Sequence, residues 1–77
     1  MLAVILKQLR LDRAGFDTLT AAATALDVKH SAVSRWESGA RRPTPQHLAI
    51  ILERYGCSKR ERDKAWAAYR AEMEAAI

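Results

Sequence analysis

The segment 25–39, ALDVKHSAVSRWESG, constrains the fold of this chain more than any other part of the sequence. It reads as the end of one helix, a turn at residues 27–29, and a second short helix that a glycine stops. Val28, Val33 and Trp36 are apolar at spacings that allow two helices to cross and share one small core. The pattern therefore predicts two short helices joined by a tight turn.

Length and composition bound the architecture and the chemistry. The 77 residues suffice for one small domain, 1–77, and because Gly and Pro are scarce and β-branched residues do not alternate, an all-α fold is expected. The single cysteine, Cys57, excludes an internal disulfide. One Cys with His30 and His47 is too few for a four-ligand zinc site, so we expect no metal and no cofactor.

No apolar run approaches the roughly 20 residues that span a bilayer, and the first ten residues lack the order of a signal peptide. We therefore expect a cytoplasmic protein without a membrane partner. Thirteen Lys and Arg against nine Asp and Glu give a net charge of +4, which suits a polyanionic partner without proving one.

Capping residues and apolar spacing predict five helices. Ala14-Gly15 ends the first helix, Asp17 or Thr18 caps the second, and Thr44-Pro45 begins the fourth. Ser58 and Glu61 match a capping box for the fifth helix. The predicted ranges are 2–13, 18–26, 30–38, 44–55 and 58–75.

These motifs resemble the helix-turn-helix domain of Cro/C1-type (XRE-like) repressors. The resemblance covers about residues 2–58 and is strongest over 26–43, which contains the family signature SRWESG (34–39) and the RRP (41–43) that often follows it. It implies a five-helix, lambda-repressor-like domain whose helix-turn-helix spans about 18–38. In that family the third helix reads the major groove of DNA and the second braces it across the phosphate backbone.

The resemblance places base contacts at the start and on the outer face of the third helix, at His30, Ser31, Ser34 and Arg35. An arginine there can fork onto the O6 and N7 atoms of guanine, and short hydroxyls can approach a base edge. The alternative for Arg35 and His30 is exposure to solvent, and for the serines it is local bonding to the helix backbone.

Basic residues also flank the third helix. Lys29, Arg41 and Arg42 lie in the two adjoining loops and are expected to hold phosphates, the alternative being solvated basic loops. The family often has a phosphate-contacting Gln in the second helix, but Leu19 stands there in this chain. That contact is therefore expected to be lost or to move to a neighbouring threonine, Thr18 or Thr20.

The resemblance further implies an ion pair between Arg10 of the first helix and Glu37. The segment after Arg10 is one residue longer than the family pattern. In the last helix, Trp66, Tyr69 and Met73 share one face, which suggests a dimer interface within residues 58–76. The alternative is that this face packs back on the first and fourth helices.

The leading hypothesis is a transcriptional regulator, such as a small Cro-like repressor or controller protein, which binds a palindromic site in double-stranded DNA as a homodimer. The alternative is an antitoxin or other protein-interaction module that binds a protein partner through its last helix. An enzyme is not expected, because no catalytic constellation or glycine-rich phosphate loop is present. No small-molecule ligand is expected either.

Overall fold

Helix boundaries in the computed structural model, which describes residues 1–76, follow the capping residues of the sequence. The side chains of Thr18, Thr44 and Ser58 each accept a hydrogen bond from a backbone N–H three residues later, at the start of a helix. Such bonds satisfy amides that have no acceptor inside the helix. The described helices are α1 (Leu2–Gln8), η1 (Leu9–Ala14), α2 (Leu19–Leu26), α3 (His30–Ser38), α4 (Pro45–Arg54) and α5 (Lys59–Ala75).

The first helix differs from its prediction. An α-helix over 2–13 is expected, whereas only α1 is α-helical and η1 continues it as a π-helix. A π turn closes its hydrogen bonds five residues apart rather than four, so it accommodates one more residue than an α turn. The segment after Arg10 thus continues the helix as a wide turn, before Gly15 ends it with a left-handed φ of 75°.

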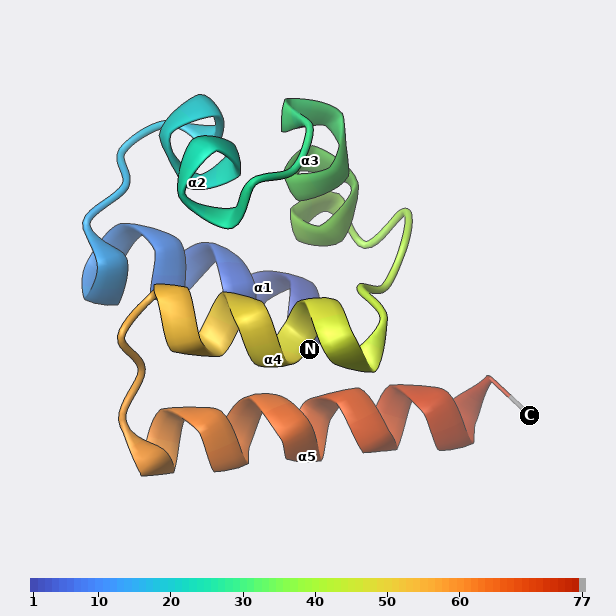
Figure 1. Ribbon diagram of the computed structural model, residues 1–77. Coiled ribbons are helices and arrows are strands. Elements are labelled where there is room, and N and C mark those ends of the chain that lie inside the picture. Colours follow the sequence, from blue (N-terminus) through green and yellow to red (C-terminus); the bar gives the residue numbers. More distant parts are fainter. Residues whose placement is uncertain (77) are drawn as a thin grey trace.

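The helices form three tiers (Figure 1). The pair α2 and α3 lies at one side, α1 and α4 occupy the middle, and α5 runs along the opposite side. Leu48, Ile51 and Leu52 of α4 are almost fully buried between the tiers. The five-helix, all-α architecture that the sequence predicts is confirmed for the described residues, which contain no strand.

Candidate nucleic-acid interface

The turn between α2 and α3 fixes the angle at which α3 is presented. Asp27 ends α2 in the left-handed region, with φ 56° and ψ 46°. The next amide, Val28 N–H, bonds back to the Ala23 carbonyl at 3.0 Å. Aspartate is one of the few residues that tolerate this conformation without glycine. The chain therefore reverses within three residues and lays α3 across α2.

The inward face of α3 determines which side chains face outward. Val33 and Trp36 are buried in the common core, as their spacing predicts. His30, Ser31 and Arg35 lie on the other side of the helix and are exposed, and Ser34 is half-buried at the edge of that face. The structure thus brings all four expected base-contacting residues onto one helix face.

An ion pair attaches α3 to the first helix. Arg10 Nε lies 2.8 Å from Glu37 Oε2 and Arg10 Nη2 lies 3.0 Å from Glu37 Oε1, a bidentate arrangement. Arg10 Nη1 also donates to the Phe16 carbonyl at 2.8 Å. The hydrogen bond to Glu37 raises the pKa of Arg10, and burial raises the pKa of neighbouring Tyr55 to about 12. The π-helical segment and the outward-facing helix are therefore held in one rigid arrangement.

The four residues expected to contact phosphates differ in their surroundings. Thr18 and Lys29 are exposed at the amino-terminal ends of α2 and α3. Arg41 is exposed in the segment 39–44, the connection between α3 and α4, and its N–H bonds to the Arg35 carbonyl at 3.2 Å. Arg42 is different, because its Nη1 donates to the Glu72 carbonyl of α5 at 3.3 Å. Arg42 therefore lies beside Arg41, but its guanidinium group also contacts α5.

A hollow of about 270 Å³ lies beside α3. The sequence predicts a DNA contact for some of the residues that line it but not for others. The hollow is lined by three arginines, Arg35, Arg41 and Arg42, together with Thr44 and His47. The His47 ring packs against Trp36, with centroids 5.4 Å apart and the ring planes tilted by 44°, and its Nδ1 lies 3.0 Å from Thr44 Oγ1. Placing His47 here needs the crossing of α3 and α4, which no local sequence signal encodes.

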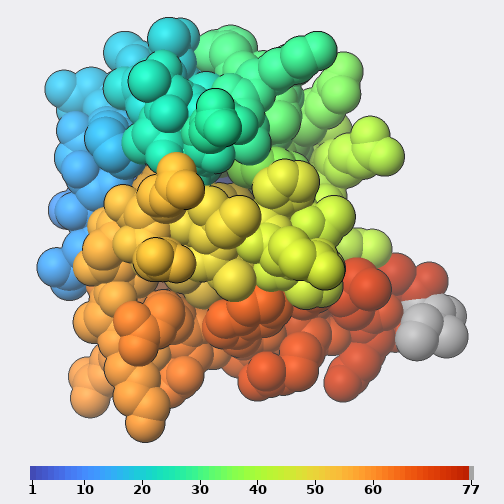
Figure 2. All heavy atoms as spheres, in the orientation of Figure 1, coloured from blue at the N-terminus to red at the C-terminus, as the bar shows by residue number. Residues whose placement is uncertain are grey.

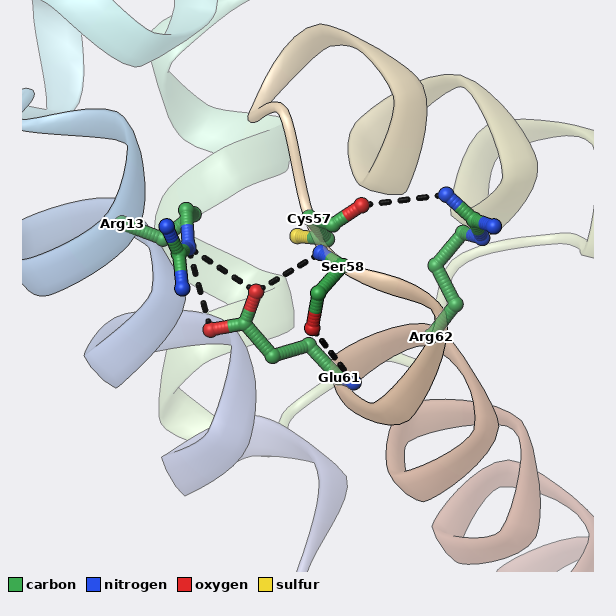
Figure 3. Close-up of polar contacts among 5 residues, drawn as sticks. All are labelled: Arg13, Cys57, Ser58, Glu61 and Arg62. Carbon is green, nitrogen blue, oxygen red and sulfur yellow. Dashed lines mark hydrogen bonds and ion pairs between the residues drawn. The ribbon is translucent and has the colours of Figure 1, made fainter.

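Polar contacts among Arg13, Ser58, Glu61 and their neighbours fix the amino-terminal end of α5 (Figure 3). Glu61 accepts the Ser58 N–H at 2.8 Å and both Glu61 oxygens accept from Arg13 Nε, at 2.9 and 3.1 Å. Arg62 donates to the Cys57 carbonyl at 3.0 Å. Burial raises the pKa of the Cys57 thiol, which disfavours the reactive thiolate.

The three residues expected at a dimer surface have different surroundings. Tyr69 is only 8% exposed and lies in the core of the single chain, against Trp66, with ring centroids 5.7 Å apart. Trp66 is half-buried and Met73 is 44% exposed. Tyr69 therefore belongs to the internal packing of α5, which leaves Trp66 and Met73 accessible to a second chain.

The fold and this exposed helix define an all-α domain built around a helix-turn-helix. Comparison with known families agrees, since the family described as a helix-turn-helix domain matches residues 2–65, and the chain belongs to that family. No curated protein and no solved structure matches the chain. No helix within residues 1–76 is both long and apolar enough to cross a membrane, and no three His, Cys, Asp or Glu residues gather there in a metal-binding arrangement.

Proposed function

We propose that this helix-turn-helix protein is a sequence-specific transcriptional regulator that binds a palindromic site in double-stranded DNA as a homodimer. The observation that carries the proposal is the exposed face of α3, where His30, Ser31 and Arg35 stand together on a helix that the core and the Arg10–Glu37 pair hold rigid. The width of the major groove admits such a helix. The deep, narrow major groove of A-form RNA does not.

In this proposal the side chains divide into two roles. Arg35 donates two hydrogen bonds to a guanine, which is worth about 1–3 kcal/mol of discrimination against other bases. His30, Ser31 and Ser34 contact neighbouring base edges. Thr18, Lys29 and Arg41 contact phosphates, which fix the position of the domain without reading sequence.

The cations beside α3 support this division. Among the described residues there are two ion pairs, Arg10–Glu37 and Arg13–Glu61. No carboxylate there lies within ion-pair distance of Arg35 or Arg41. A groove of DNA presents a row of phosphates to which such uncompensated guanidinium groups are drawn. The regulator would then repress by occupying a site that overlaps a promoter.

Selection from a random duplex library at about 0.15 M salt tests the proposal, with light scattering on the same sample. The expected result is an enriched palindrome whose half-sites lie about one helical turn, roughly 34 Å, apart, bound by a dimer. Absence of any enriched sequence, with only weak salt-sensitive binding, contradicts sequence-specific recognition.

The variant Arg35→Ala examines the base-reading role. It is expected to relax the preference at one base position in each half-site while leaving the other positions selective. Competition between duplexes that differ at single positions measures this effect. Equal weakening on every duplex would show that Arg35 contacts the backbone alone.

A protein-interaction module is the second candidate, and one observation favours it. The apolar side chains of Val4 on α1 and Met73 on α5 are 51% and 44% exposed, so both are accessible to a protein partner. Copurification of a stoichiometric protein partner, together with failure of the duplex selection, would support this alternative.

A further inference from the structure

The carboxyl-terminal turn of α5 meets two other parts of the chain, the start of α1 and the segment 39–44. We propose that Arg42 and Glu72 tie these three parts into one junction that positions Arg41 for DNA contact. Arg42 is then a positioning residue and not a phosphate ligand. The inference rests on the proposed function, because its main readout is DNA affinity.

The first half of the junction is a cap on α1. The first turn of α1 has no acidic residue, and Met1 makes no side-chain capping bond. The amides at the start of a helix lack internal acceptors and favour negative charge. Glu72 Oε2 lies 2.6 Å from the Leu2 N–H, so a side chain 70 positions later caps the first helix.

The second half is a cap on α5. The last turn of α5 contains no basic residue, although the carboxyl-terminal end of a helix favours a cation. Arg42 provides that cation from the segment 39–44, through its 3.3 Å bond to the Glu72 carbonyl. The same carbonyl accepts the Ala76 N–H at 3.1 Å, so its two lone pairs are both used.

The segment 39–44 packs against the start of α1 only in part. A Cβ on Gly39 would lie 3.5 Å from Met1 Cε, but a hollow of about 360 Å³ with Met1, Gly39 and Glu72 in its walls remains beside the segment. Figure 2 shows the segment, in yellow-green, at one edge of the molecule between the green of α3 and the red end of α5. Three features hold the segment: buried Pro43, the bond from the Arg41 backbone N–H to the Arg35 carbonyl, and the bond from the Arg42 side chain to α5.

Two neighbouring arginines consequently have different surroundings. The Arg41 guanidinium has no hydrogen-bond partner among residues 1–76, whereas that of Arg42 is directed to α5. Glu72 belongs to α5, which lies in the tier opposite α2 and α3 (Figure 1), and its carboxylate accepts from the Leu2 N–H of α1. We therefore expect an effect of the Glu72 side chain on DNA affinity to pass through the junction.

The salt dependence of DNA affinity separates the two arginines. Each phosphate contact adds about 0.9 to the slope of log affinity against log salt. Arg41→Ala is expected to reduce that slope by about this amount in each chain. Arg42→Ala is expected to weaken binding about fivefold, at the low end of couplings between distant sites, with little change in slope. A slope reduced as much as in Arg41→Ala, or an unchanged affinity, overturns the proposal.

A matched pair of variants at Glu72 tests the coupling from the far side. Glu72→Gln keeps an oxygen that can accept the Leu2 N–H and is expected to retain most of the affinity. Glu72→Ala removes the side-chain cap on Leu2 but keeps the main-chain carbonyl that accepts from Arg42, so it is expected to weaken binding less than Arg42→Ala. The double variant is expected to bind no more weakly than Arg42→Ala alone, because the Glu72 side chain can act on the segment 39–44 only through the bond from Arg42. Fully additive losses overturn the proposal.

Amide hydrogen exchange provides a readout without DNA. Slow exchange at Leu2, lost in Glu72→Ala while circular dichroism shows a folded domain, supports the junction. Fast exchange at Leu2 in the wild-type protein overturns the junction and leaves the proposed function standing. Wild-type protein that binds no DNA overturns the proposed function and, with it, the positioning role of Arg42.

Discussion

Arg10 combines burial with full charge, which is uncommon for a side chain. Among the described residues, Arg10 is the charged residue that is buried in the core. The side chains of Arg10 and Glu37 are only 6% and 8% exposed, respectively. Burying a charge is unfavourable unless hydrogen bonds and an opposite charge compensate for it. The guanidinium meets that condition with three bonds, two to Glu37 and one to the Phe16 carbonyl.

Removing one partner of this pair is expected to be costly. Arg10→Met leaves the Glu37 carboxylate buried without its cation, and we expect the free energy of unfolding to fall by roughly 3 kcal/mol. Urea denaturation monitored by circular dichroism measures the change. Arg13→Ala, which removes an exposed ion pair with Glu61, is the control and is expected to cost much less. Equal losses in the two variants would contradict the structural role of Arg10.

Asp27 is the non-glycine residue with positive φ among those described. A left-handed conformation costs an L-residue about 1–2 kcal/mol, of which aspartate recovers a part. Asp27→Ala is accordingly expected to lower the free energy of unfolding by about 1 kcal/mol, and Asp27→Gly to leave it unchanged or raise it slightly. Thermal denaturation of the two variants side by side tests this order, and an alanine variant as stable as the glycine variant would contradict it.

At the scale of single elements, α5 begins with the most complete cap in the molecule. Ser58 and Glu61 exchange backbone N–H bonds in a capping box, and Arg13 adds an ion pair to the same carboxylate. The bond from the Ser58 backbone lowers the pKa of Glu61, and Arg13 lowers it further. The long, mostly polar helix α5 thus depends on local chemistry at its start.

This lowered pKa gives the protein a predictable acid response. The folded-state pKa of Glu61 lies below the unfolded value of about 4.3, so its contribution to stability is complete above that pH and disappears as pH falls through the folded pKa. Glu61→Gln is expected to be less stable than wild type near neutral pH, with the difference shrinking below about pH 4. Urea midpoints across this range measure it, and a difference independent of pH would exclude the charge of Glu61 as the cause.

The extent of the whole molecule bears on the proposed dimer. The domain measures 33 × 26 × 19 Å, so two copies side by side can hold two α3 helices about 34 Å apart. Met73 is exposed on α5, and Val4 is exposed on α1. These are two of the five exposed large apolar side chains in the described residues, and they offer a second copy contacts on two different helices.

Met73→Glu is expected to convert the proposed dimer to monomer without lowering stability, because a charge on an exposed apolar contact disfavours association. Light scattering and thermal denaturation measure the two effects, and Val4→Glu is the matched control. If Val4→Glu were monomeric and Met73→Glu remained dimeric, the result would assign the dimer interface to α1 and not to α5.

The helices were largely predictable because their signals are local. Capping by Thr18, Thr44 and Ser58, and the apolar spacing of Val33 and Trp36, depend on residues only a few positions apart. The exception is η1. Whether the segment around Arg10 forms a loop or a π-helix depends on the tertiary contacts that it makes. The outward face of α3 follows from the same spacing, because burial of one side exposes the other.

The sequence by itself therefore determined the five helices, most of their ends, and the residue types on the exposed face of α3. Tertiary structure alone decided that the first helix continues as the π-helix η1, that Tyr69 is core, that His47 packs against Trp36, and that Arg42 bonds to α5 while Arg41 does not. Helix signals act over three or four residues, whereas these outcomes join side chains 11 to 30 positions apart or depend on how α5 crosses the core. Such contacts arise only when the packed helices fix the direction in which each side chain points.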